Sequence, residues 1–210
     1  MNLLKDTRCY LAGPVEQVEA DEAISWRKEM ASFLSKIGVK AYDPLIKPPW
    51  LPPACHVDPK AYIPILEKTQ EPTIYTDGMG SDVLITPEVS IEANHYMRMV
   101  DLRIVHAVDW ILCFLPKKFT SGTFEEVYEG LRVGKPVLFC CPDGIVSTWL
   151  LAAVTRGTNH SEYFFSNWDL LKKHVLEINR GQVLLDPVKW IFLAWRGEDW
   201  GNPLAEPDWR

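Results

Sequence analysis

The chain of 210 residues has no hydrophobic run long enough to cross a membrane. Its longest apolar stretches, such as residues 110 to 115, are far shorter than the roughly 20 residues that a membrane-spanning helix needs. The first six residues also lack the apolar segment of a secretory signal peptide. We therefore expect a cytoplasmic protein without a membrane partner.

The sequence also has no excess of basic residues. Lys and Arg number 22 against 28 Asp and Glu, which gives a net charge of −6 and a pI near 5.4. A protein that binds the backbone of DNA or RNA needs clustered Lys and Arg to neutralise phosphates. The composition therefore argues against a nucleic-acid polymer as substrate or partner.

The cysteines do not suggest a disulfide framework, because their number is five and most of them lie in apolar, strand-like runs. Cys55, His56 and Asp58 are residues of the metal-ligand type, but no second Cys or His pair completes a zinc spacing. We expect no metal and no cofactor. The remaining cysteines are expected to be buried free thiols, namely Cys9, Cys113, Cys140 and Cys141.

What the sequence does contain is an ordinary globular composition, with 47% hydrophobic and 24% charged residues. Strand-like runs at residues 8 to 12, 39 to 42, 110 to 115, 136 to 141 and 163 to 165 alternate with helix-like segments at residues 22 to 36, 88 to 107, 123 to 133, 147 to 154 and 168 to 178. This alternation predicts an α/β fold, a flavodoxin-like doubly wound five-stranded parallel sheet. The spacing on the first helix predicts an apolar stripe of Ile24, Met30, Phe33, Leu34 and Ile37.

Residues 44 to 87 hold nine of the sixteen prolines, which is incompatible with long regular elements. We interpret this Pro-rich region as a functional loop or lid inserted into a single α/β domain of residues 1 to 186. Its aromatic side chains either stack on a ligand or anchor the loop on its own domain: Trp50, Tyr62 and Tyr75.

The remaining residues, 187 to 210, form a Trp-rich C-terminal extension. So many large apolar rings rarely stay in water. We expect the extension to pack on the domain or on a neighbouring subunit through Trp190, Trp195, Trp200 and Trp209.

Three motifs are candidates for chemistry, because ligands of open α/β sheets bind in the loops at the strand ends. The first is Tyr10-Leu11-Ala12-Gly13-Pro14, the second is Asp101 with Asp109, and the third is Ser121-Gly122-Thr123-Phe124-Glu125-Glu126. Each also has a plain structural interpretation. Thr123 and Glu126 fit a helix capping box, the aspartates fit solvated or turn positions, and Tyr10 fits a packing role.

In their order and spacing, these motifs together with Gly134-Lys135-Pro136-Val137 resemble the nucleoside 2-deoxyribosyltransferase family over residues 9 to about 142. The resemblance implies that Glu126 is the nucleophile, that Tyr10 orients it and that Asp101 lies near the base. Glu125 is the adjacent competitor, since only the family spacing separates the two glutamates. The resemblance further implies a set of substrate-binding residues, namely Gly13, Asp43, Thr120, Ser121, Gly122 and Thr123.

The chemistry of that family suits these residue types. A carboxylate in the first turn of a helix is kept ionised by the helix dipole and unpaired backbone N–H groups, and we expect Glu126 to occupy such a position. Its attack at C1′ would leave a covalent glycosyl-enzyme, with the nucleobase as leaving group. Asp101 is the candidate acid, because a partly desolvated carboxyl group can have its pKa raised.

One position departs from the best-known transferases that the chain resembles. They carry an acidic residue six positions before the nucleophile, where this chain has Thr120. Related 5′-nucleotide N-glycosidases have a hydroxyl residue there that contacts the phosphate, and a helix N-terminus suits such an anion. Those glycosidases, however, place an arginine soon after the first glycine, where this chain has Val15-Glu16-Gln17 and Glu16 would repel a phosphate.

Three functions therefore stay open. The first is an enzyme that moves the sugar of a 2′-deoxynucleoside to another nucleobase or to water. The second is a hydrolase of nucleoside 5′-monophosphates that uses the same Glu126 chemistry. The third is a non-catalytic nucleotide-binding module in which Glu126 only caps its helix. A homo-oligomer is expected, because the resembled enzymes build their sites across subunits and the Trp-rich extension needs a surface to cover it.

Overall fold

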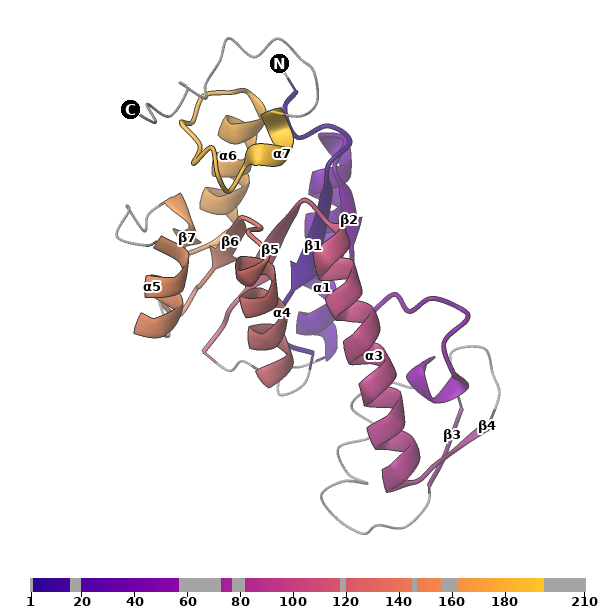
Figure 1. Ribbon diagram of the computed structural model, residues 1–210. Helices are drawn as coiled ribbons and strands as arrows, with labels where there is room; N and C mark the ends of the chain where they lie inside the picture. Colours follow the sequence, from indigo (N-terminus) through magenta and orange to yellow (C-terminus); the bar gives the residue numbers. More distant parts are fainter. Residues whose placement is uncertain are drawn as a thin grey trace.

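The computed structural model describes residues 2–15, 20–56, 73–76, 82–117, 120–144, 147–155 and 162–194. Its centre is a five-stranded parallel sheet (Figure 1). In spatial order the strands are β2 (Lys40–Tyr42), β1 (Arg8–Ala12), β5 (Trp110–Phe114), β6 (Val137–Cys140) and β7 (Phe164–Phe165). Numbered along the chain, these five strands have the order 2-1-3-4-5, which is that of the flavodoxin-like fold. The predicted fold class is confirmed.

The central strands are apolar throughout because a parallel sheet is covered on both faces. Every residue of β5 and β6 is buried. In the register of the sheet, Cys9 lies beside Trp110 and Ile111 lies beside Val137. All five cysteines are buried free thiols.

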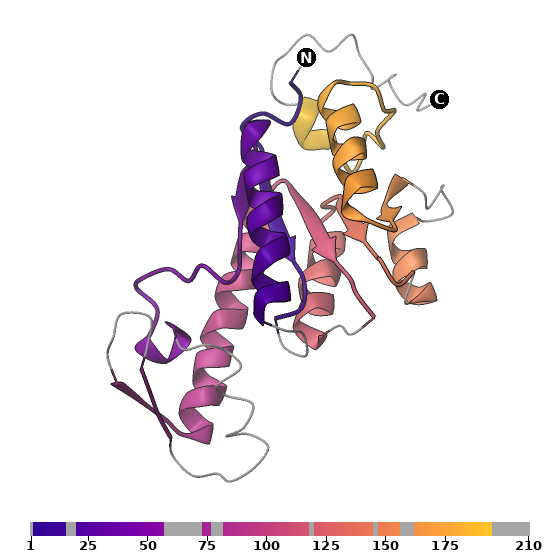
Figure 2. The same cartoon turned by 180° about the vertical axis from the view of Figure 1, so that it is seen from behind.

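Helices cover both faces of the sheet. On one face lie α3 (Pro87–Ala107) and α4 (Ser121–Arg132), with α5 (Thr148–Thr155) beside β7 (Figure 1). The other face is covered by α1 (Ala20–Lys36) and α6 (Trp168–Asn179), as seen from behind in Figure 2. Trp26 of α1 stacks on Trp168 of α6 with ring centroids 5.3 Å apart, so the two helices form one layer.

The predicted apolar stripe of α1 is partly wrong. Ile24 is 38% exposed, whereas the neighbouring Trp26 and Arg27 are buried together with Met30 and Leu34. Arg27 takes an inward position because backbone carbonyl groups there accept its hydrogen bonds. A stripe drawn from apolar residues alone could not include it.

A second, smaller hydrophobic cluster lies around the first half of α3. It consists of Leu51, Ala54, Cys55, Ile85, Ala93 and Met97. The 3-10 helix η1 (Pro53–His56) and the antiparallel pair β3 (Thr73–Thr76) and β4 (Asp82–Ile85) belong to the Pro-rich region and form, with this half of α3, a lobe that projects from the sheet (Figure 1). These elements are short, as the density of prolines requires.

The described part of the C-terminal segment ends with α7 (Ile191–Ala194). Trp190, just before α7, is buried against Trp110 of β5, with ring centroids 6.2 Å apart. The other tryptophans of the predicted extension lie outside the described residues, as does Tyr62. Across the described ranges, no helix is both long and apolar enough to cross a membrane.

Candidate active site

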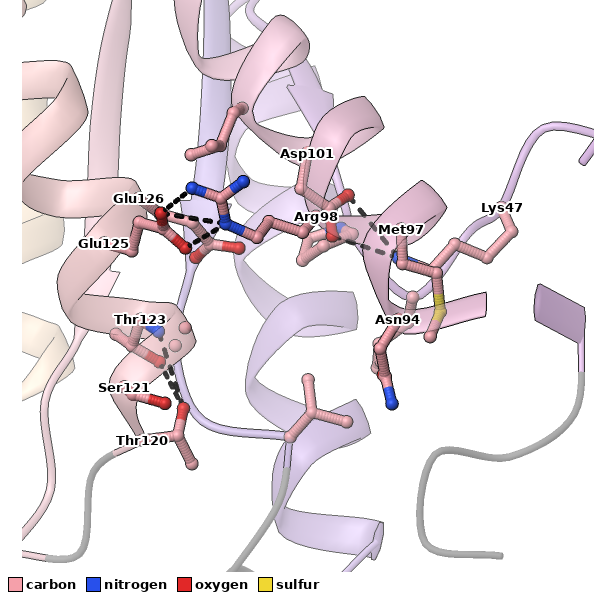
Figure 3. A pocket seen from close by; sticks show the side chains of 16 residues that line it. Lys47, Asn94, Met97, Arg98, Asp101, Thr120, Ser121, Thr123, Glu125 and Glu126 are labelled. Atoms are coloured by element: carbon pink, nitrogen blue, oxygen red, sulfur yellow. Dashed lines mark hydrogen bonds and ion pairs between the residues drawn. The ribbon is translucent and has the colours of Figure 1, made fainter. Parts of the chain in front are cut away.

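A pocket of about 560 Å³ opens where the loops after β1 and β2 meet α3 and the start of α4 (Figure 3). Gly13 and Val15 follow β1, and Pro44, Leu45 and Lys47 follow β2. These loops leave the carboxyl ends of parallel strands, which is where doubly wound sheets bind ligands. The opposite wall is formed by residues of α3, of the N-cap of α4 and of α4 itself: Asn94, Met97, Arg98, Asp101, Leu102, Thr120, Ser121, Gly122, Thr123, Glu125 and Glu126.

Glu126 and Tyr10 meet at this pocket. The Tyr10 hydroxyl donates a hydrogen bond of 2.7 Å to Oε1 of Glu126. Tyr10 lies on β1, an inner strand of the sheet, and has no exposed surface. Burial raises the pKa of Tyr10 well above its ordinary value, so the hydroxyl keeps its proton and acts as a donor.

The start of α4 differs from the capping box that the sequence suggested. Thr120 is the N-cap residue, and its hydroxyl accepts from the backbone N–H of Thr123 at 3.5 Å. The helix therefore begins at Ser121, and Glu126 lies in its second turn. Both the capping role of Glu126 and its expected place in the first turn are wrong, because the hydroxyl of Thr120 caps the helix three residues earlier than Thr123 would.

Burial dominates the electrostatics of Glu126. It raises the pKa of the Glu126 carboxyl from 4.5 to about 8. The hydrogen bond from Tyr10 and the positive charges of Arg27 and Lys47 oppose this shift, while the charge of Asp101 adds to it. In the free protein the carboxyl is therefore largely protonated at neutral pH, contrary to the ionised state that a first-turn position would favour.

Asp101 lies on the same wall, on α3. Its Oδ2 forms an ion pair of 3.2 Å with Nζ of Lys47, which reaches across from the loop after β2 (Figure 3). Burial raises the pKa of Asp101, and the positive charge of Lys47 opposes this rise. The pocket thus holds two carboxyl groups whose ionisation is disfavoured by burial.

Glu125, the neighbour of Glu126, has a different environment. Its carboxylate oxygens accept hydrogen bonds of 2.9 and 2.7 Å from Nε of Arg98, and its side chain is 39% exposed (Figure 3). Glu125 and Arg98 therefore form a solvated ion pair at the rim of the pocket.

The other residues of the predicted site divide into two groups. Gly13 and the four residues from Thr120 to Thr123 line the pocket. Asp43 lies behind it, because its carboxylate accepts from the backbone N–H of Leu45 at 2.9 Å and faces Nε of Arg27 at 3.6 Å.

Asp109 lies away from the pocket. It precedes β5, so it lies at the amino end of the sheet, where it accepts a hydrogen bond of 2.7 Å from the backbone N–H of Arg8.

The sequence did not identify Lys47, Arg98 and Asn94 as residues of the pocket. It also did not identify Arg27 as the cation that lies behind the wall. A signal for part of this set was present, since Asn94, Arg98 and Asp101 lie at helical spacing on one face of α3. Lys47 carried no such signal, because its position depends on the path of a Pro-rich loop.

The sequence matches no family of known sequences and no curated protein. Among solved structures, the chain is similar to a 2-deoxyribosyltransferase from Bacillus psychrosaccharolyticus, with a TM-score of 0.45 and 16% identity over 79% of this chain and 90% of that chain. A similarity of this size assigns no role to any residue of this chain. Among the described residues, no three His, Cys, Asp or Glu side chains gather as ligands of a metal ion.

Proposed function

We propose that this chain cleaves the N-glycosidic bond of a nucleoside or nucleotide, with Glu126 as the nucleophile. The observation that carries the proposal is the 2.7 Å hydrogen bond from Tyr10 to the half-buried carboxyl of Glu126, in a pocket that also contains Asp101. A hydroxyl donor fixes one carboxylate oxygen and leaves the other to attack.

The local environments favour Glu126 over Glu125 as nucleophile. Both oxygens of Glu125 are bound by Arg98 at the exposed rim, which lowers their tendency to attack carbon. Glu126 is half-buried and has no basic group bonded to its carboxyl in the hydrogen bonds of the described residues. Desolvation makes an ionised carboxylate a stronger nucleophile once the substrate has displaced water.

In the proposed reaction, Glu126 first releases its proton to solvent, and an oxygen of the resulting carboxylate forms a bond to C1′ while the bond from C1′ to the base nitrogen breaks. The electron pair of the broken bond stays on the base, and Asp101, in the protonated form that burial favours and Lys47 opposes, supplies a proton to it and becomes a carboxylate. The raised pKa of Asp101 suits this role. Water or a second nucleobase then attacks C1′, the carboxylate of Asp101 takes up the proton of the attacking group, and the carboxylate of Glu126 leaves.

The preferred substrate is a 2′-deoxynucleoside, and the sugar passes to another base or to water, as the motif resemblance implies. A nucleoside 5′-monophosphate is the second candidate. One observation favours it: the N-terminus of α4, with Ser121 and Gly122, lines the same pocket as Lys47 and Arg98. Backbone N–H groups at a helix N-terminus bind phosphate oxygens well.

A single set of incubations tests these alternatives. The protein is incubated with deoxyadenosine or deoxycytidine, each with and without a second free base, and separately with the corresponding 5′-monophosphates. Chromatography then follows base release and base exchange. Exchange supports transfer, release from the monophosphates alone supports the hydrolase, and binding without turnover supports a non-catalytic module.

The matched variants are Glu126→Gln and Glu125→Gln. We expect Glu126→Gln to lose turnover and Glu125→Gln to retain most of it, because only Glu126 is placed to bond to the sugar. Mass spectrometry of the quenched reaction should find one deoxyribosyl group on the peptide that contains Glu126. If Glu125→Gln were inactive while Glu126→Gln turned over normally, the assignment of the nucleophile would be wrong.

A further inference from the structure

Lys47 is a cation of the loop after β2 that lines the pocket. Its Nζ lies 3.2 Å from Oδ2 and 3.4 Å from Oδ1 of Asp101, which belongs to α3 (Figure 3). Only 12% of the Lys47 side chain and 14% of the Asp101 side chain are exposed. Within the described part of the chain, the hydrogen bonds of Lys47 go to Asp101 alone. The two side chains therefore form one shielded polar pair at the pocket.

This pair can present two hydrogen-bond donors to a ligand. An ammonium group has three N–H donors and no acceptor, and a carboxyl group engages at most two of the three here. When Asp101 is protonated, one of its oxygens accepts from Lys47 and the other carries an O–H donor. Burial raises the pKa of Asp101 and so favours this form, which Lys47 opposes. The two donor atoms are then 3.2 to 3.4 Å apart.

Two neighbouring donors match a ligand edge that carries two neighbouring acceptors. The N7 and O6 atoms of guanine and hypoxanthine, the 6-oxopurines, form such an edge, and lysine is one of the side chains that recognise it in nucleic acids. In adenine, N7 lies beside the N6 amino group, which is a donor. An ammonium facing that amino group would leave both donors without a partner, which is unfavourable in a shielded pocket.

The proposed reaction brings this edge of the base to the pair. A general acid must come within about 2.6 to 3.2 Å of the atom that it protonates. Nζ of Lys47 is bonded to the carboxyl of Asp101, so an acceptor next to the protonated atom lies within its reach. When Asp101 gives its proton to N7, the electron pair of the broken bond to C1′ stays on N9. The purine then leaves as a neutral base with its proton on N7.

Apolar side chains adjoin the pair on both of its elements. Met97 lies one turn before Asp101 on α3, and Leu45 lies two residues before Lys47 on the loop after β2. Both line the pocket. A thioether and an aliphatic side chain pack well against the face of an aromatic ring, so this part of the pocket suits a nucleobase.

We propose that Lys47 is a specificity-determining residue that, together with Asp101, recognises the N7 and O6 acceptors of a 6-oxopurine. Lys47 donates to O6, and Asp101 donates to N7. The proposal rests on the function proposed above, because it uses Asp101 as the acid. It narrows the substrate to nucleosides or nucleotides of guanine and hypoxanthine.

The first test measures binding of free bases and needs no turnover. Calorimetric titration compares hypoxanthine with adenine for the wild type, Lys47→Met and Lys47→Gln. The wild type should bind hypoxanthine about tenfold more tightly, and Lys47→Met should bind the two bases about equally. Lys47→Gln should bind adenine at least as tightly as hypoxanthine, because the amide oxygen of Gln accepts from the N6 amino group.

Three results of the titration would overturn the proposal. The first is a wild type that binds neither base, and the second is one that binds adenine as tightly as hypoxanthine. The third is a preference for hypoxanthine that Lys47→Met retains. The control is Lys173→Met on α6, where the lysine side chain is 73% exposed and lies 3.9 Å from Glu177. This variant should keep the preference of the wild type.

The second test compares kcat/KM for 2′-deoxyinosine and 2′-deoxyadenosine. The ratio of the two values should be about ten in the wild type and in Lys173→Met, and about one in Lys47→Met. An equal loss of turnover on both substrates, with an unchanged ratio, would show that Lys47 only orients Asp101 and would overturn the proposal.

The two tests also separate two failures. If Lys47→Met abolishes a preference for hypoxanthine in binding but no substrate is cleaved, the proposed function is wrong and the recognition of 6-oxopurines stands. If nucleosides are cleaved through Glu126 but the base preference does not depend on Lys47, the proposed function stands and the role of Lys47 is wrong.

Discussion

Replacing Glu126 by Gln removes a carboxyl group whose ionisation the folded protein opposes. Burial raises the pKa of Glu126 to about 8 in the folded protein, whereas the group titrates near 4.5 in the unfolded chain. Between these two pH values the unfolded chain releases the proton and the folded protein keeps it. The wild type therefore has its full stability below the unfolded pKa and loses stability as pH rises towards the folded one.

The size of this loss follows from the two pKa values. At about 1.4 kcal/mol per pH unit, the wild type loses roughly 3 kcal/mol by pH 7 and roughly 5 kcal/mol by pH 9. At pH 5 the loss is only about 1 kcal/mol. Gln does not titrate and still accepts the hydrogen bond of Tyr10. The advantage of Glu126→Gln in free energy of unfolding should therefore grow with pH.

Denaturant unfolding of both proteins at pH 5, 7 and 9 measures this advantage. Glu125→Gln is the control, because its carboxylate lies at the exposed rim with Arg98, and a surface ion pair contributes only about 0 to 1 kcal/mol. An advantage of Glu126→Gln that stayed constant from pH 5 to pH 9, or that fell with rising pH, would refute the burial argument.

Three further outcomes are expected. Tyr10→Phe should lower kcat roughly a hundredfold and move the acidic limb of the pH profile upwards, because Glu126 loses the hydrogen bond that orients it and opposes its raised pKa; steady-state kinetics measure both. In the wild type, kcat/KM should rise with pH towards about 8, as the carboxyl of Glu126 ionises, and a flat profile would contradict its role as nucleophile. Gly13→Ala should destabilise the fold by about 1 to 3 kcal/mol in thermal unfolding, because a Cβ atom there would lie 2.7 Å from Cζ2 of Trp26 and 3.3 Å from the carbonyl oxygen of Phe114.

The sheet could be predicted from the sequence because its strands are buried on both faces and therefore read as continuous apolar runs. β5 and β6 are the clearest examples, with every residue buried. The pair β3 and β4 was not predicted, since the prolines around it favour irregular structure. The sequence of β3, Thr-Ile-Tyr-Thr, carries a β-forming composition, but four residues are too few to outweigh that context.

The sequence predicts which residues reach the site where their place at the end of a strand or helix decides this. It does not predict the properties of the site that depend on burial. Gly13 follows β1 and Ser121 begins α4. The ends of these elements meet at one edge of the sheet, so topology alone brings both residues to the pocket. The pKa of Glu126 depends on how completely neighbouring elements exclude water, and sequence spacing does not report this. The inward orientation of Arg27 depends on three carbonyl groups that only the folded chain gathers.

α3 has one half in the lobe cluster and the other half on the main sheet. A small cluster opens locally at a lower free energy than a domain core, so amide hydrogens in the first half of α3 should exchange with solvent before those in the second half. Asn94, Met97 and Arg98 lie towards the lobe, whereas Val105 belongs to the main core. Binding of a ligand in the pocket should therefore slow hydrogen exchange in the first half of α3, although the main sheet sets the global stability.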